Sequence, residues 1–294
     1  MSSMRSIKKR ISNVQSAEQI VKAMNMVASS KLYKIRAQLE GTRPMYEELK
    51  GIVEEVASIK EAQSHVFYEE KDVKSSLYVI LTSDRGLSGG YNSNIIKKAL
   101  EHMEQEEKNE KIFVVGSKGY ENFKRLNKNI VRRVIDMADA QLYYGSKNIS
   151  KRIREFYLSG RVDEVFICYT KFENVLTTVP VVEKLLPING KADGESDMED
   201  VYNNKKYEPS LNEYIEHVVP LYLHVSVFRA LSESHTSEQA ARMINMDAAA
   251  KNASELVEDL TSVYNRKRQA AITQELNEIV AGANILKKGG IDDR

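Results

Sequence analysis

The sequence predicts an α/β protein in which long N- and C-terminal helices form an antiparallel coiled coil, with a central Rossmann-like α/β domain between them. Each end of the chain carries apolar residues at steps of three and four, which is the spacing of a coiled-coil seam. The middle instead alternates strand-like runs with amphipathic stretches, which favours a largely parallel sheet. We therefore expect a coiled-coil helix over 1–60, an α/β foot domain over 74–209, and a coiled-coil helix with its tail over 210–294.

The N-terminal helix is predicted from one narrow stripe of apolar or small residues. The stripe consists of Ile7, Ile11, Val14, Ala17, Val21, Met24, Ala28, Leu32, Ile35 and Leu39. Pro44 has no backbone donor, so we expect the helix to kink or break briefly there. Apolar spacing then resumes over 49–59, which indicates that the helix continues beyond the proline.

The middle segment is predicted to hold five strands and three helices. The strand-like runs are 77–82, 111–116, 131–135, 163–172 and 177–188, and the amphipathic stretches are 95–103, 120–126 and 140–158. Residues 189–206 are polar and acidic and are expected to form a solvated loop.

The C-terminal helix is expected from about 210 to 286, with Pro220 in a first turn or at a kink. Its stripe contains Met243, Met246, Ala250, Ala253, Val257, Leu260 and Tyr264. Near 267–272 the apolar residues change phase, and the new stripe holds Ile272, Leu276, Ile279, Ala283 and Leu286. An apolar tip off the seam suggests that the longer helix leaves its partner and enters another protein.

Both helices are too long to be buried in an ordinary domain, because about 65 helical residues span ~100 Å. Packing them along each other buries both stripes. The compact middle segment joins the end of one helix to the start of the other, which favours an antiparallel pair with the α/β domain at the connecting end.

Composition excludes several classes of protein. The 43 basic and 42 acidic residues nearly cancel, so the net basic charge typical of nucleic-acid binders is absent. Cys168 is the single cysteine, which excludes a disulfide framework or a cysteine-based zinc site, and we expect a buried structural thiol. The five histidines show no metal-binding spacing. No apolar run is long enough to span a bilayer and no secretory signal is evident, so we expect a reducing, cytoplasm-facing location.

Three runs of the sequence resemble the γ subunits of F-type ATP synthases. They are IKKRISNVQSAEQIVKAMNMVASSKL (7–32), LTSDRGLSGGYNSN (81–94) and SEQAARMINMDAAAKNASELVEDLTSVYNRKRQAAITQELNEIVAGA (237–283). The resemblance implies a central-stalk rotor with no catalytic residues and no cofactor. Such a rotor stands in the bore of the α and β subunits, rests on the ε subunit and the membrane c-ring, and turns when protons or sodium ions flow. It implies a peripheral position on the cytoplasmic side of a bacterial plasma membrane.

The resemblance also implies which residues contact the α and β head: Met24, Glu238, Arg242, Arg268, Gln269 and Thr273. The tip residues Ile272, Leu276, Ile279 and Ala283 would turn in the bearing of that head. The residues alone allow simpler interpretations. Met24 could be an ordinary seam residue, and Glu238 with Arg242 could be a solvated i,i+4 pair.

The glycine-rich loop after the first strand has two interpretations. Asp84, Arg85, Gly86, Gly89 and Gly90 belong to it, and the resemblance places it on the side of the c-ring and ε. Its glycines could bind phosphate, but the spacing matches neither common phosphate-binding pattern. A tight strand-to-helix turn is the favoured interpretation.

Two other functions compete with the rotor. One is a small Rossmann-like enzyme that dimerises through coiled-coil arms, which requires nucleotide or substrate binding by the isolated chain. The other is a coiled-coil tether or adaptor, which needs no apolar tip. Association with α and β chains, with ATPase activity confined to that assembly, would distinguish the rotor from both.

Overall fold

A computed structural model describes residues 4–190 and 207–289, with side chains described as far as 284. The chain divides into two compact units, Met1–Met26 together with Asn245–Arg294, and Val27–Ile244. Two long helices belong to both units: α1 (Met4–Ala57, 54 residues) and α6 (Leu211–Gly289, 79 residues). The predicted pair of long terminal helices is therefore present. The predicted loop over 189–206 lies mostly outside the described residues.

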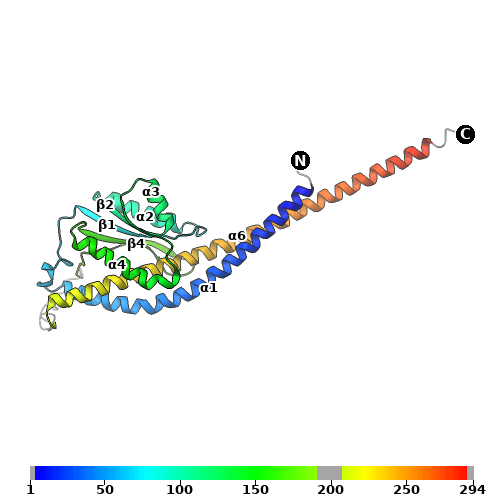
Figure 1. Cartoon of the computed structure of the whole chain (residues 1–294). Coiled ribbons are helices and arrows are strands. Elements are labelled where there is room, and N and C mark those ends of the chain that lie inside the picture. Colours follow the sequence, from blue (N-terminus) through cyan, green and yellow to red (C-terminus); the bar gives the residue numbers. More distant parts are fainter. Residues whose placement is uncertain (1–3, 191–206, 290–294) are drawn as a thin grey trace. The chain divides into compact units, whose positions relative to one another are not determined.

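Of the kink or brief break expected at Pro44, the break is absent, because α1 continues through the proline as one helix (Figure 1). An internal proline costs a helix about 3 kcal/mol. The residues that follow offset this cost, since Tyr46, Leu49 and Val53 are all buried. Pro220 likewise lies inside α6, as the tenth residue of a helix that starts at Leu211, so it does not occupy a first turn.

The buried stripe of α1 differs from the predicted one at a single place. Ala17 is exposed, and its neighbour Glu18 is the partly buried residue, with its carboxylate 2.7 Å from the Nζ of Lys22. A strict alternation of four- and three-residue steps from Val14 to Val21 passes through 18 rather than 17, so the geometry of the helix selects the polar residue.

A mixed sheet with the strand order β3-β2-β1-β4-β5 forms the centre of the unit Val27–Ile244. The strands are β1 (Ser75–Leu81), β2 (Asn109–Val115), β3 (Ile130–Val134), β4 (Glu164–Phe172) and β5 (Thr178–Leu186). All neighbours are parallel except β4 and β5, which are antiparallel. This confirms the largely parallel sheet.

Helices cover both faces of the sheet (Figure 1). On one face, α2 (Tyr91–Glu106) and α3 (Ser117–Arg125) bury Ile95 and Phe123 against Tyr78 and Ile80. On the other, α4 (Leu142–Leu158) and the first part of α6 pack with α1 against the rest of the core. Two short 3-10 helices, η1 (Ala62–Ser64) and η2 (Asp139–Gln141), also belong to this unit. Cys168 is fully buried in the sheet, as expected, and burial raises the pKa of its thiol.

The two long helices run antiparallel where they meet inside this unit. Leu32 and Leu39 of α1 cluster with Ala240 of α6. Further along α1, the ring of Tyr46 stacks on Tyr222, with centroids 6.2 Å apart. Because the contacts move backward along α6 as they move forward along α1, the predicted antiparallel pairing is confirmed.

In the other unit, the seam of α6 ends abruptly. Residues from Met246 to Ala271 provide buried or partly buried positions at three- and four-residue steps, among them Ala250, Val257 and Leu260. From Ile272 to 284 every described side chain is exposed. No described helix contains an apolar stretch long enough to cross a bilayer.

Candidate functional site

The crevice at the carboxyl ends of β1 and β4 is the place where an open α/β sheet usually binds its ligand, because the strand order reverses there. In this chain α6 fills it. Ser237 donates a 3.1 Å hydrogen bond to the carbonyl of Thr170, and Ser234 shares one of 2.7 Å with the hydroxyl of Tyr91. The cavity that remains beside α6, at the carboxyl ends of β1 and β2, measures about 60 Å³. Ligand pockets usually measure ~300–1,000 Å³, so this crevice does not admit a nucleotide.

The loop between β1 and α2 is a tight turn held by its own side chains, as the favoured interpretation predicted. The side chain of Asn92 accepts a 2.9 Å hydrogen bond from the backbone N–H of Ser83 and donates one of 2.7 Å to the hydroxyl of Ser83. The carboxylate of Asp84 accepts from the backbone N–H and hydroxyl of Ser117, at 2.8 and 2.9 Å. Gly89 has a φ of 56°, a left-handed conformation that suits glycine. Arg85, Gly86 and Gly90 are exposed.

Glu238 and Arg242 form a buried ion pair that holds this loop against α6. Each residue is 8% exposed, and the carboxylate lies 2.6 Å from the guanidinium. Arg242 also donates to the carbonyl of Gly86 at 3.3 Å. The interpretation of a solvated helix pair is therefore wrong, because both side chains are buried. A buried carboxylate is favourable only when it is paired in this way.

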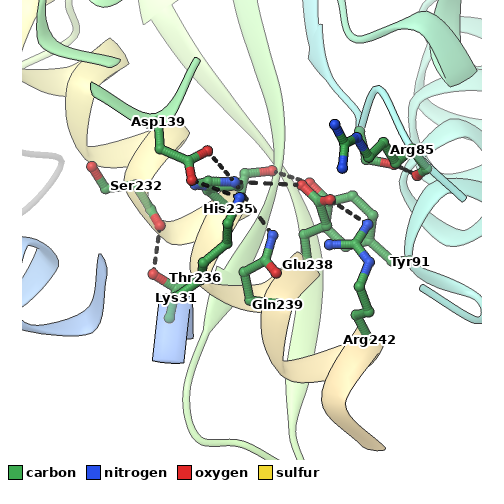
Figure 2. Close-up of polar contacts among 12 residues, drawn as sticks. Lys31, Arg85, Tyr91, Asp139, Ser232, His235, Thr236, Glu238, Gln239 and Arg242 are labelled. Atoms are coloured by element: carbon green, nitrogen blue, oxygen red, sulfur yellow. Dashed lines mark hydrogen bonds and ion pairs between the residues drawn. The ribbon is translucent and has the colours of Figure 1, made fainter. Parts of the chain in front are cut away.

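His235 extends the pair into a row of ionisable side chains, which we name the loop cluster: Lys31, Asp139, His235, Glu238 and Arg242 (Figure 2). The Nε2 of His235 lies 3.4 Å from the carboxylate of Asp139 and 4.0 Å from that of Glu238. Lys31 of α1 approaches Asp139 to 2.8 Å. Burial opposes ionisation of Asp139, but Lys31 and His235 lower its pKa overall. The loop cluster thus connects α1, η2, α6 and the loop before α2.

A second group of polar residues, the Arg229 cluster, ties both long helices to the sheet. It consists of Tyr46 of α1, Tyr169 of β4, Glu183 of β5, and Arg229 and Glu233 of α6. The guanidinium of Arg229 lies 3.9 Å from the ring centroid of Tyr46, donates to the hydroxyl of Tyr169 at 2.8 Å, and donates to Glu183 at 2.7 Å. Glu183 also accepts from both tyrosine hydroxyls, at 2.8 and 3.0 Å.

Electrostatics inside the Arg229 cluster follow its geometry. Burial works against the charge of Glu183, yet Arg229 and the hydrogen bonds from Tyr46 and Tyr169 hold its pKa below the ordinary value. For Glu233 burial dominates and raises the pKa, although Arg229 and Arg43 oppose the shift. The Arg229 cation therefore pairs chiefly with Glu183, which it contacts 0.9 Å more closely than Glu233, at 2.7 rather than 3.6 Å.

Sequence reasoning missed the Arg229 cluster. The signal that could have found it is a charge inside an apolar run, since Arg229 interrupts HVSVFRAL and Glu183 interrupts VPVVEKLL. Such a charge is almost always paired when its segment is buried. None of the predicted contact residues of the head belongs to the Arg229 cluster. Glu238 and Arg242 lie in the loop cluster. Met24 is partly buried on α1, whereas Arg268, Gln269 and Thr273 are exposed on α6.

The predicted tip residues lie on the exposed end of α6. Ile272, Leu276 and Ile279 are 48%, 56% and 68% exposed, and Ala283 is also exposed. Within the described residues, no group of three or more His, Cys, Asp or Glu side chains could hold a metal ion.

Comparison with known proteins gives one family. A family model described as ATP synthase matches residues 3–286. The ATP synthase gamma chain of Desulforamulus reducens is 38% identical over 287 residues, which cover 98% of this chain and all of the relative. A chain of the central stalk and c-ring of the Tetrahymena thermophila mitochondrial ATP synthase superposes with a TM-score of 0.62 at 26% identity, over 78% of this chain and 99% of that one. A chain of the Euglena gracilis mitochondrial ATP synthase superposes with a TM-score of 0.69 at 17% identity, over 98% of this chain and 95% of that one.

Proposed function

This chain belongs to the ATP synthase gamma chain family, and we propose that it carries the rotation of a membrane c-ring to the catalytic α and β head of an F-type ATP synthase. Ion flow through the ring then drives ATP synthesis, and ATP hydrolysis in the head drives rotation in reverse. Moving one charge through 100 mV supplies ~2.3 kcal/mol, so several ions must act through one mechanical link for each ATP. A single asymmetric chain supplies that link, because it can contact three otherwise identical sites differently.

The loss of burial along α6 after Ala271 carries this proposal. A coiled coil that served only as a tether would not need the exposed apolar residues Ile272, Leu276 and Ile279 beyond the end of its seam, because exposed apolar patches usually mark an interaction site. Insertion of the tip into a ring of partner subunits covers these side chains. Arg268, Gln269 and Thr273 precede or flank the tip on the same helix and are exposed, so they are available to the same partners. Met24 is partly buried, which leaves one side of it for contact with the head.

The two polar clusters suit the transmission of torque. A turning sheet domain transmits its rotation to α1 and α6 only if the helices do not slip on it. Apolar packing resists separation but is non-directional, whereas hydrogen bonds and ion pairs define one register. The Arg229 cluster joins α1 and α6 to β4 and β5, and the loop cluster joins α6 to the loop before α2.

Glu238 and Arg242 act in this proposal through the loop rather than by direct contact with the head. Their burial within the chain supports that role. The loop they hold exposes Arg85, Gly86 and Gly90 and contains Asp84 and Gly89, and we assign this surface to the ε subunit and the c-ring.

The chain itself performs no catalysis in this proposal, because α6 occupies the crevice that a Rossmann-like enzyme uses for its substrate. Catalysis belongs to the α and β head. We place the chain peripherally on the cytoplasmic side of a bacterial plasma membrane, in keeping with its bacterial relative of full length.

Reconstitution tests the proposal. The full chain is mixed with its α and β chains, and the assembly is assayed for composition, ATP hydrolysis and rotation of a bead attached to the sheet domain. We expect one copy of this chain for three α and three β, with hydrolysis confined to the assembly. A chain ending at Ala271 should still assemble with the α and β chains but slip against them, so that ATP is hydrolysed while the torque on the bead is reduced. ATP hydrolysis by the isolated chain, or undiminished torque after truncation, would contradict the proposal.

A further inference from the structure

The edge strand β3 is the least covered part of the sheet. It pairs with β2 on one side, and among the described residues no strand pairs with its other side. Its residues are partly buried or exposed throughout, whereas those of β1 are almost all fully buried. An uncovered edge presents a row of backbone N–H and C=O groups to which another strand can add.

Two open grooves flank this edge, one on each face of the sheet. The first lies toward α3, measures about 670 Å³, and is lined by Tyr120, Lys124, Asn127, Lys128 and residues 130–133. The second lies toward α4 and measures about 700 Å³, with Phe113, Met137, Tyr144 and Ile149 among its lining residues. The helices α3 and α4 are on opposite sides of the sheet (Figure 1). A strand added to β3 would therefore direct alternate side chains into the two grooves.

Both grooves are basic. Within the described chain they are lined by one carboxylate, that of Asp136, and by six cations: Lys124, Lys128, Arg132, Arg133, Lys151 and Arg152. Lys128 pairs with Glu110 and Arg152 with Glu155. The described residues give no carboxylate partner to Lys124, Arg132 or Arg133, although Arg133 lies over the ring of Tyr120 at 4.5 Å.

The two grooves differ in their apolar content. The groove toward α4 exposes Ile135 at 41% and Tyr144 at 69%, beside the partly buried Val134 and Met137. The groove toward α3 is mainly polar and charged. The register between β2 and β3 skips Val131, so that Arg132 pairs with Phe113 and lines both grooves.

We propose that this edge is a docking site for an extended acidic polypeptide segment in which acidic and apolar residues alternate. The segment adds to β3 as a further strand. Its carboxylates face Lys124, Arg132 and Arg133, and its apolar side chains cover Ile135 and Tyr144 in the groove toward α4. A second copy of this chain does not fit, because pairing of two β3 strands would oppose their arginines. Charges on an edge also prevent aggregation. Protection against aggregation explains the charges on the strand itself, Arg132 and Arg133. It does not explain Lys124 of α3 and Lys151 of α4, which line the grooves beside the strand.

Binding of a designed peptide tests the proposal. A short fluorescein-labelled peptide of alternating Glu and Val is titrated with the full chain, and anisotropy is measured. We expect binding that weakens with added salt. Arg132→Glu and Lys124→Glu should each weaken it by about tenfold or more, because each reverses a charge that faces the peptide. The matched control is Lys98→Glu on α2, an exposed cation outside both grooves, which should bind as the unchanged chain does.

Two further measurements separate strand addition from general attraction to a basic surface. A peptide of the same composition with its Glu and Val in separate blocks should bind at least about tenfold more weakly, because alternation is lost. Hydrogen exchange at the amides of Ile130–Val134 should slow when the alternating peptide binds. Circular dichroism establishes that each variant is folded. Absence of binding, equal binding of both peptides, or equal loss in Lys98→Glu and Arg132→Glu would overturn the proposal.

Discussion

The guanidinium of Arg229 lies 3.9 Å from the ring centroid of Tyr46, so a residue of α6 is stacked on a residue of α1 at the level of the sheet. The same guanidinium donates to Glu183 on β5. One buried cation thus connects the two long helices to each other and to the α/β domain. This relationship makes the Arg229 cluster the place where a change of one side chain should affect the whole unit.

Replacing Arg229 with Met should destabilise the unit Val27–Ile244 by about 3–5 kcal/mol, because Glu183 and Glu233 would lose their buried partner. Chemical denaturation followed by circular dichroism measures this loss. The double variant Arg229→Met, Glu183→Gln should recover part of it, since the unpaired carboxylate is then removed. A double variant no more stable than Arg229→Met would show that Glu183 is not the principal partner.

Stability should depend on pH through Glu183. Its pKa in the folded chain is below the ordinary 4.5, so the folded state binds fewer protons than the unfolded state when the pH falls past that value. The stabilisation that ionised Glu183 gives the folded chain is complete above pH 4.5 and is lost as the pH falls through the pKa of Glu183 in the folded chain. Denaturation curves at a series of pH values should therefore show a weaker acid dependence in Glu183→Gln.

Glu233 provides a control of opposite sign. Burial raises its pKa above 4.5, so the folded state binds more protons and stability declines as the pH rises past that value. Glu233→Gln should remove this decline, whereas Glu183→Gln should not. Identical pH profiles for the two variants would contradict the assignment of Arg229 to Glu183.

Two glycines should respond to alanine in opposite directions. Gly116 has a φ of 96°, and a Cβ there would lie 2.3 Å from the carbonyl oxygen of Thr82, so Gly116→Ala should destabilise by at least ~3 kcal/mol. Gly41 lies inside α1 with nothing within 4 Å of an added Cβ, and Gly41→Ala should stabilise by ~0.5–1 kcal/mol. Thermal unfolding of both variants measures the contrast. Equal effects would mean that backbone conformation at 116 is not restrictive.

Arg242→Met should release the loop before α2 without unfolding the sheet. The variant loses the hydrogen bond to Gly86 and leaves Glu238 without its closest cation. Trypsin should then cut after the exposed Arg85 faster than in the unchanged chain, as followed by mass spectrometry. Arg36→Met is a suitable control, because its pair with Glu40 is about half exposed and lies elsewhere on α1. Unchanged cutting at Arg85 would show that other contacts hold the loop.

Much of the fold could be predicted because the signals are local. Steps of three and four residues predicted α1 and α6, and apolar runs such as that around Cys168 predicted every strand of the sheet within a few residues. Of the kink or break expected at Pro44, the break was wrong because local propensity ignores the buried Tyr46 and Val53 that follow it. Ala17 was assigned to the seam because it is apolar, although helix geometry selects Glu18.

The sequence by itself determined the two long helices, the sheet between them and the exposed apolar tip, since each depends on the spacing of residues close together in the chain. Only the tertiary structure decided that Glu238 and Arg242 are buried and that Arg229 joins both helices to the sheet. Arg242 meets a carbonyl 156 residues away, and Arg229 a carboxylate 46 residues away. Contacts between distant segments depend on how the helices pack on the sheet, and residue spacing within either segment does not specify them.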